Sequence, residues 1–191
     1  MNINIVMKKN GLRGLEMQRP QLKYFKCHPD APSLRFATQG SACFDIAASW
    51  AKDKEISVYS PRDSTKENIL CDELTLQYGQ RALVPTGLIF DIPDGYSVRL
   101  YPRSGNAIKV GLTLINAVGV IDSDYKREVF VAVVNTSRHT VSIRNGDRIC
   151  QGELFQNEWY EFYELTESPS TDGEHGAGFG STGGVSGHEK A

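Results

Sequence analysis

The alternation of apolar and polar positions predicts a chain of short β-strands. Residues 96–101 alternate with period two, which places Tyr96, Val98 and Leu100 on one face of a strand. Residues 129–134 form a continuous valine-rich apolar run, which is typical of a strand buried on both faces. Further strands are predicted at residues 22–26, 74–76, 81–92, 141–144, 148–155 and 159–165.

Turn signals separate these strands, whereas a helical period is scarce. Asn145-Gly146 follows the strand at 141–144, and Pro93-Asp94-Gly95 separates the strands at 81–92 and 96–101. One short helical segment is predicted over residues 104–110. Many closely spaced strands with almost no helix indicate an all-β fold, either a β-sandwich, a jelly roll or a small barrel.

Local composition divides the chain into three parts. Residues 1–21 are predicted to form an N-terminal extension, and residues 22–166 the β domain. Within that domain residues 51–70 are polar and charged, which predicts a surface insertion with a hairpin around residues 56–59. Residues 167–191 are rich in glycine and poor in large apolar side chains, so we expect a flexible C-terminal arm.

Overall composition excludes several classes of protein. The chain has 191 residues, a hydrophobic fraction of 40 % and a formal net charge of −2, which argues against stable binding to nucleic acid. No apolar run approaches the roughly 20 residues that span a bilayer, and no secretory signal is evident, so no membrane partner is expected. The four cysteines form no C-x-x-C pair, which suits reduced thiols in the cytoplasm.

Two segments of the β domain carry candidate chemistry. Asp122 and Asp124 follow an apolar run, and on an extended backbone both carboxylates would point to one face. Such a pair could hold a metal, supply a general base, or lie in a solvated turn. Arg103 and Ser104 follow Pro102, where the guanidinium could bind phosphate and the serine could either cap a short helix or donate to an anion.

Three further segments complete the set of candidates. The arm contains the segment 178–183, where glycine amides and hydroxyls could meet an anion and Phe179 could stack on a base, unless the arm is only a linker. The turn at 146–151 delivers a charged pair and Gln151. The segment 37–48 places one carboxylate, Asp45, among small neutral residues.

In this order and spacing, the five segments resemble the five motifs of the homotrimeric dUTPase family, which hydrolyses dUTP to dUMP and pyrophosphate. The resemblance runs from about residue 22 to residue 183. It implies a jelly-roll-like β-barrel and a homotrimer whose active sites are shared between subunits. It also implies Mg²⁺ as the cofactor, and a role in keeping uracil out of DNA and supplying dUMP for dTMP synthesis.

The resemblance assigns roles in the chemistry and in recognition of the nucleoside. Asp122 matches the general base that activates water for attack on the α-phosphorus. The residues that match the uracil- and sugar-binding group are Asn116, Val120, Ile121 and Tyr125. Tyr125 is the member of this group that would pack against the deoxyribose and exclude a ribose 2′-hydroxyl.

Other matched residues would hold the triphosphate and its metal. Those that match the phosphate site are Arg103, Ser104, Gly105 and Gln151. In the arm, Phe179 would stack over uracil, and Ser181 and Thr182 would donate to the γ-phosphate. Asp45 would contact Mg²⁺ through water, while the phosphate oxygens supply most of the shell.

The sequence departs from the family pattern at several positions. Either Glu174 or Gly173 stands where the arm usually has an arginine for the γ-phosphate. Cys43 replaces a usual glycine, and Asn106 replaces a usual leucine. Two rival functions stay open. One is deamination of dCTP by an enzyme that shares the fold, which would release ammonia. The other is a non-enzymatic protein that senses nucleotides.

Overall fold

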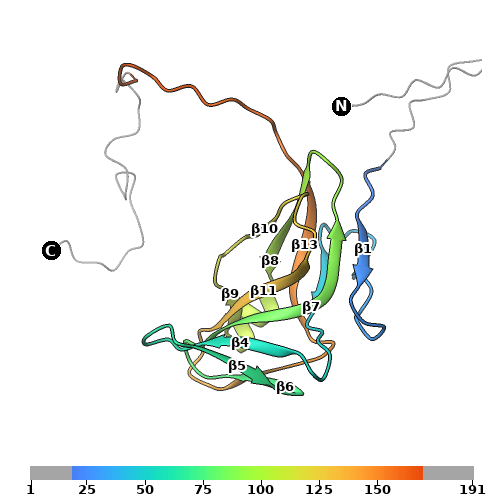
Figure 1. Cartoon of the computed structure of the whole chain (residues 1–191), viewed down its shortest axis with the longest axis vertical. Coiled ribbons are helices and arrows are strands. Elements are labelled where there is room, and N and C mark those ends of the chain that lie inside the picture. The colour runs from blue at the N-terminus through green and yellow to red at the C-terminus, as the bar shows by residue number, and fades with distance from the viewer. Residues whose placement is uncertain (1–18, 170–191) are drawn as a thin grey trace, which may run out of the picture. The chain divides into compact units, whose positions relative to one another are not determined.

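The computed structural model describes residues 19–169 and confirms the all-β expectation. Within these residues, thirteen strands pair in three antiparallel sheets. The first sheet has the order β5 (Lys66–Leu70), β4 (Glu55–Tyr59), β7 (Arg81–Asp91), β11 (Glu128–Asn135), β9 (Leu112–Leu114), with β1 (Lys23–Lys26) also paired to β7. Figure 1 shows β7 and β11 as long curved strands that lie side by side.

The second sheet carries the strands on which the candidate motifs lie. Its order is β10 (Gly119–Ile121), β8 (Tyr96–Pro102), β13 (Arg148–Gln156), β3 (Phe44–Ala47), β2 (Arg35–Phe36). β12 (Val141–Arg144) and β6 (Glu73–Leu76) form a separate pair. A short π-helical turn, η1 (Asn106–Val110), follows β8 where a helix was predicted.

Alternating side chains of these strands form one hydrophobic core. Phe90, Ile46, Ile56 and Leu100 are among its largest buried members, and they come from both main sheets. Phe44 packs edge-on against Phe90 with ring centroids 6.4 Å apart. The core therefore joins the two sheets and holds the strand ends that carry the polar motifs.

Strand β11 differs from its prediction as a strand buried on both faces. Val129, Val131 and Val133 are buried, whereas Phe130 and the other residues between them are partly exposed. A strand in one sheet buries both faces only when something covers each of them, and here the core covers one. The burial along β11 therefore has period two.

The predicted strand at 159–165 is absent from the structure. The compact unit of strands closes at Glu158, short of the expected boundary at residue 166. Trp159 and Phe162 are 84 % and 88 % exposed, and no residue of this segment pairs with another strand. The prediction was wrong because aromatic strand propensity forms a strand only where a neighbouring strand or packed surface receives it.

The hairpin expected within residues 51–70 is present, but half of it belongs to the core. β4 pairs with β5 on one side and with β7 on the other. Ile56 and Val58 are buried against the core, whereas β5 and the turn before it are largely exposed. The description as a surface insertion therefore holds for β5 and not for β4.

Within residues 19–169 no helix is long and apolar enough to cross a membrane. All four cysteines are free thiols. The N-terminal residues 1–18 and the arm residues 170–191 lie outside the described residues.

Candidate active site

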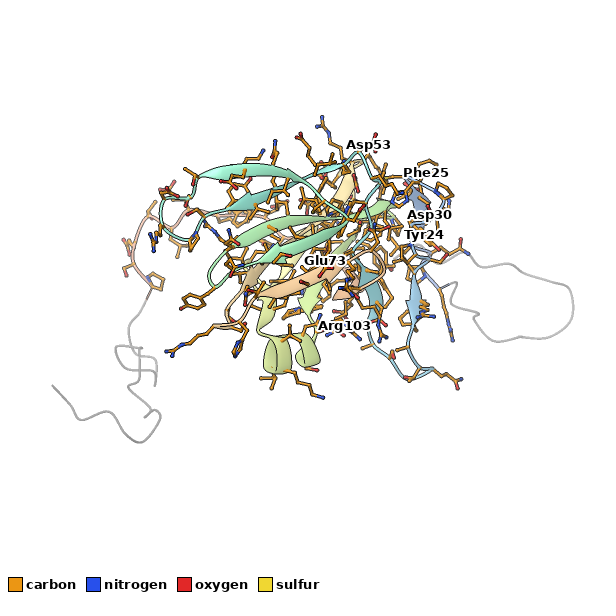
Figure 2. All side chains as sticks on the ribbon, turned by 90° about the horizontal axis from the view of Figure 1, so that it is seen from below. Tyr24, Phe25, Asp30, Asp53, Glu73 and Arg103 are labelled. Carbon is orange, nitrogen blue, oxygen red and sulfur yellow. The ribbon has the colours of Figure 1, made fainter. Side chains whose placement is uncertain are left out.

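Three neighbouring strands of the second sheet build a polar cleft. Gln151 on β13 pairs with Asp45 on β3 and with Tyr101 on β8, so these side chains share one face of the sheet. Arg103 follows the end of β8, next to η1 (Figure 2). The cleft measures about 440 Å³, and its lining is Ala37, Ser41, Ala42, Cys43, Asp45, Arg103, Ser104, Gly105 and Gln151.

The Asp45 carboxylate holds two arginines at this cleft. Its side chain is 12 % exposed, Oδ1 lies 3.2 Å from Arg103 Nε, and Oδ2 lies 3.1 Å from Arg148 Nη1. One carboxylate balances one of two guanidinium groups, so this cluster keeps a net positive charge. A guanidinium fork beside a polar cleft is suited to an anion such as phosphate.

Arg148 is a member of the site to which sequence reasoning gave no role. The ladder between β13 and β3 has a register shift between Arg148 and Cys150. Ile149 and Cys150 are consequently both buried, although they are consecutive. Such a bulge re-aims the neighbouring side chain. The two consecutive apolar residues within an alternating strand were the only sequence signal of it.

Ser104 and Gly105 are not explained by capping of η1. Gly105 occupies the N-cap position with helical φ −63° and ψ −41°, and no side-chain cap bond is formed there. A Cβ added to Gly105 would meet nothing within 4 Å. Ser104 lines the cleft, and its role as a donor to an anion stays a prediction.

Gln151 is oriented by its neighbouring strand. Its Nε2 donates to the carbonyl oxygen of Pro102 at 3.1 Å. This bond uses one of the two amide N–H donors and leaves the other N–H and the Gln151 side-chain oxygen, which can accept from a water or a hydroxyl.

Another group of predicted residues lies on the turn between β9 and β10 and on β10 itself. Asn116 begins a tight turn in which Val118 N donates to its carbonyl oxygen at 2.6 Å, and Ala117 adopts φ 58°. A Cβ on Gly119 would lie 3.2 Å from Asn116 Nδ2, so this glycine allows the amide to pack closely. Val120 is 55 % exposed, and Ile121 is partly buried.

Asp122 and Asp124 do not lie on an extended backbone as expected. Tyr125 N donates to the carbonyl oxygen of Asp122 at 3.2 Å, which closes a turn over residues 122–125. The argument that both carboxylates share a strand face therefore fails. No group of three or more His, Cys, Asp or Glu side chains suited to a metal occurs among residues 19–169.

Within one chain, the structure does not bring Asp122 to the arginine cleft. Asp122 follows β10, whose last residue Ile121 pairs with Val98 near the start of β8, whereas Arg103 follows the end of β8. The five residue steps from Val98 to Arg103, at about 3.3 Å each, separate the two levels by about 17 Å. Of the described residues, those that line the cleft include neither Asp122 nor Tyr125.

Two thiols near the cleft differ in their surroundings. Burial, followed by the negative charge of Glu153, raises the pKa of the partly exposed Cys43 thiol. Burial raises the pKa of Cys150 to about 12. Both groups are therefore neutral thiols at neutral pH, and only Cys43 lines the cleft.

The predicted arm residues Phe179, Ser181 and Thr182 lie outside the described residues, as does Glu174. Their roles stay predictions.

The fold and the cleft together define a class: an all-β protein with a cationic phosphate-type site at the ends of adjacent strands. Comparison with known proteins identifies the family within this class. The chain belongs to the dUTPase family, whose model matches residues 69–183.

Its relatives extend over most of the chain. It is 37 % identical over 164 residues to the deoxyuridine 5′-triphosphate nucleotidohydrolase of Caulobacter vibrioides, a match that covers 85 % of this chain and 93 % of that protein. It is 48 % identical over 112 residues to the protein of the same name from Finegoldia magna, covering 59 % of this chain and 78 % of that protein.

Solved structures share the fold at lower sequence identity. A mutant of the Staphylococcus bacteriophage 80alpha dUTPase with dUpNHpp has a TM-score of 0.64 and 21 % identity, and the match covers 85 % of this chain and 98 % of that one. The dUTPase from Streptococcus mutans has a TM-score of 0.54 and 23 % identity, with 73 % and 98 % covered. These similarities support the all-β architecture.

Proposed function

We propose that this protein is a dUTP diphosphatase that hydrolyses dUTP to dUMP and pyrophosphate by attack of water on the α-phosphorus. The observation that carries the proposal is the cleft in which Asp45 holds Arg103 beside Ser104 and Gln151. Such a cleft offers a fixed cationic fork and neutral donors to a polyphosphate. The family membership supplies the substrate, since the curated relatives are named for hydrolysis of this nucleotide.

In the proposed mechanism, the phosphate cleft stabilises the leaving group. Arg103 binds phosphate oxygens, and Ser104 donates near the oxygen that bridges the α- and β-phosphorus atoms, where negative charge develops. Gly105 allows close approach of the phosphates, because it carries no side chain on the exposed side of the turn. Gln151 accepts from and orients the attacking water.

The turn before β10, β10 itself and the turn that follows it recognise the nucleoside and activate water. Asp122 takes a proton from the water as general base. Tyr125 packs against the deoxyribose, and Asn116 with the backbone of Val120 and Ile121 binds the uracil. An exposed turn beside an edge strand of the second sheet suits this role.

The proposed active site is shared in a homotrimer. The distance of about 17 Å along β8 between the end of β10, which Asp122 follows, and Arg103 prevents one chain from presenting both to the same phosphorus atom. A closed ring of identical subunits brings the base of one chain to the cleft of its neighbour. Phe179, Ser181 and Thr182 of the arm then cover the nucleotide, which follows from the family resemblance.

The donor set fits a magnesium ion that arrives with the triphosphate. Asp45 is the only carboxylate lining the described cleft, and arginines pair with both of its oxygens. Mg²⁺ prefers six oxygen ligands, so phosphate oxygens and water would fill most of its shell and Asp45 would contact it through water. When bound, such an ion neutralises charge on the phosphates.

This activity would keep uracil out of DNA and supply dUMP for dTMP synthesis. We place it in the cytoplasm, where free thiols persist and where the nucleotide pool is accessible.

A substrate panel tests the proposal. Pyrophosphate release is measured from dUTP, dTTP, dCTP and UTP, with and without Mg²⁺, and ammonia release is measured from dCTP. We expect rapid Mg²⁺-dependent release from dUTP alone. Release of ammonia from dCTP would contradict the proposal and identify the protein as a deaminase. Tight dUTP binding without turnover would indicate a nucleotide sensor.

The substitution Asp122→Asn tests the general base. It should preserve the fold and dUTP binding while lowering kcat by about 10²-fold or more, the usual contribution of a positioned base. Steady-state kinetics and calorimetric binding of a non-hydrolysable dUTP analogue measure the two effects. Near-normal turnover in this variant would exclude Asp122 as the base.

A further inference from the structure

One partly buried carboxylate anchors the downstream end of the segment that carries Asp122 and Tyr125. Glu128 begins β11, and its side chain is 16 % exposed. Its Oε1 accepts a hydrogen bond of 3.0 Å from Gly87 N, and its Oε2 lies 3.0 Å from Lys54 Nζ. Each carboxylate oxygen thus has a specific partner, and these charge-assisted bonds exceed an ordinary surface ion pair in strength.

The carboxylate acts where the ladder between β11 and β7 is irregular. Glu128 pairs with Ile89, but Phe130 pairs with Pro85, so the register shifts between them. Pro85 has no N–H to donate, and the Thr86 hydroxyl donates to the Val129 carbonyl at 2.8 Å instead. Side chains therefore replace ladder bonds at this bulge, and the Glu128 carboxylate satisfies the neighbouring Gly87 N–H.

The same residue contacts the segment that holds the proposed base. Tyr125 Oη donates to the Glu128 carbonyl at 3.0 Å, and Tyr125 N donates to the Asp122 carbonyl at 3.2 Å. Upstream, Ile121 pairs with Val98. The segment 122–128 is therefore held at one end by the sheet and at the other by Glu128.

Lys54 brings the segment 51–70 into this arrangement. It lies immediately before β4, and its ammonium group is 5.3 Å from the centre of the Phe130 ring as well as 3.0 Å from Glu128. Phe130 and Glu128 belong to the same strand, β11. The start of the β4–β5 hairpin thus contacts the strand that leads out of the Asp122 segment.

We propose that Glu128, held by Lys54 and Gly87, is a positioning residue that orients Asp122 and Tyr125 for hydrolysis and for rejection of ribonucleotides. This inference rests on the proposed function. It gives the β4–β5 hairpin a role: its first lysine stabilises the carboxylate on which the Asp122 segment is anchored.

Kinetics of Glu128→Ala, Glu128→Gln and Lys54→Met test the inference. Glu128→Ala should lower kcat by about 10²-fold, because small displacements of a reacting group have effects of this size. Glu128→Gln keeps an oxygen for the Gly87 N–H and should lower kcat by roughly tenfold. Lys54→Met should act through the same carboxylate, so adding it to Glu128→Ala should change kcat by less than about twofold.

The preference for dUTP over UTP, measured as a ratio of kcat/KM values, distinguishes positioning from loss of folded protein. A smaller amount of folded enzyme lowers both values equally, whereas a misplaced Tyr125 should lower the ratio by roughly tenfold. Glu73→Gln is the matched control, because it removes another ion pair, to Arg144 at 2.8 Å, in the separate β12–β6 pair. It should leave kcat and the ratio unchanged.

Wild-type turnover of dUTP in the same assay separates this inference from the proposed function. If wild type is active and both Glu128 variants keep kcat and the dUTP/UTP ratio within about twofold, Glu128 does not position the site. The thermal unfolding of each variant is also measured. Should Glu128→Ala fail to fold, Glu128→Gln and Lys54→Met decide the question by the same two readouts.

Discussion

At the scale of single residues, Asp45 organises the arginine cleft, which we assign to phosphate, through charge. Its carboxylate is mostly buried, and it holds Arg103 and Arg148 from two different strand ends. Removing one member of this cluster leaves a charge of another member unpaired in a mostly buried position. The resulting loss of folding free energy is larger than the loss from breaking an exposed ion pair. The resemblance to the dUTPase family placed this acid near metal-bound water, and the structure adds its pairing with two arginines.

Substitution of Gly105 should weaken binding of the substrate without destabilising the fold. Its backbone is helical, and a Cβ there meets no protein atom within 4 Å, so Gly105→Ala should preserve or slightly raise the melting temperature. The added methyl group would occupy cleft volume that we assign to phosphate, so KM for dUTP should rise at least tenfold, a loss of about 1.4 kcal/mol in binding.

Gly40→Ala is the control for this prediction, since a Cβ there also meets nothing within 4 Å and Gly40 does not line the cleft. It should alter neither the melting temperature nor KM. If Gly105→Ala and wild type have the same KM for dUTP, Gly105 is not part of the substrate site.

Cys43 should report occupancy of the cleft through its alkylation rate. Its raised pKa leaves less of the reactive thiolate at pH 7 than in a free cysteine, so the rate should be slow and should keep rising with pH beyond 9. Saturating dUTP analogue should slow the reaction, because Cys43 lines the cleft. Cys150, whose pKa is about 12, should stay unmodified in the native protein.

Mass spectrometry of peptides labelled by iodoacetamide measures these rates site by site. Cys27, which is exposed and outside the cleft lining, provides the internal control and should react equally with and without the analogue. Protection of Cys27 alone, with Cys43 unaffected, would place the ligand elsewhere.

At the scale of elements, two bulges place the functional side chains. The register shift at Arg148 on β13 brings a second arginine to Asp45. At the register shift after Glu128 on β11, the Gly87 N–H donates a hydrogen bond to the Glu128 carboxylate, next to the Asp122 segment. The bulge on β13 re-aims the Arg148 side chain, whereas the extra residues at the second shift lie on β7, where Gly87 N meets the Glu128 carboxylate.

Strand β4 should contribute to global stability despite its charged sequence neighbourhood. Ile56 is fully buried in the core, and Ile56→Ala should lower the free energy of unfolding by about 2–5 kcal/mol. Leu70→Ala is the matched control on β5, opposite Glu55 at the start of β4, because Leu70 is 61 % exposed. It should change the free energy of unfolding by less than about 0.5 kcal/mol.

Denaturant unfolding of the two variants measures both values. A cost for Ile56→Ala as small as that for Leu70→Ala would mean that β4 is an added surface hairpin, as its polar sequence suggested.

At the scale of the whole molecule, the incomplete site of a single chain points to an assembly. The base segment and the arginine cleft occupy opposite ends of β8. Exposed apolar side chains lie on η1, on the β9–β10 connection and on β10, among them Ile108, Ile115 and Val120. Such surfaces are typical of subunit contacts.

Mixing two inactive variants should restore activity. Asp122→Asn lacks the base and Arg103→Gln lacks the cleft arginine, so a site between two chains is complete when each chain supplies its intact part. Random trimers from an equal mixture should regain about a quarter of the wild-type sites. Activity is measured after the two proteins are unfolded and refolded together, with each variant refolded alone as the control.

In the mixing experiment, light scattering measures the molecular mass of the refolded protein. Absence of recovery in a mixture that forms trimers would mean that both residues act within one chain. A fully active monomer would exclude the shared site altogether.

Much of the fold could be predicted from short-range pattern. Period-two alternation and turn residues located β1, β6, β7, β8, β12 and β13, because side-chain direction and backbone preference are local properties. The very short strands β2, β9 and β10 were missed, since a segment of two or three residues carries too little pattern and forms only against its neighbour. The strand predicted at 159–165 is absent for the converse reason. The segment has the pattern of a strand, but no strand among the described residues pairs with it.

The sequence by itself determined the strand-rich class, the residue types of the phosphate cleft and, through motif order, the family. Tertiary structure alone decided that Asp45 joins Arg103 to Arg148, that β4 belongs to the core, and that Asp122 lies in a turn at the far end of β8 from the cleft. Each of these depends on strand register or on a bulge. Both are set by pairing between segments distant in sequence, so no local pattern along the chain contains them.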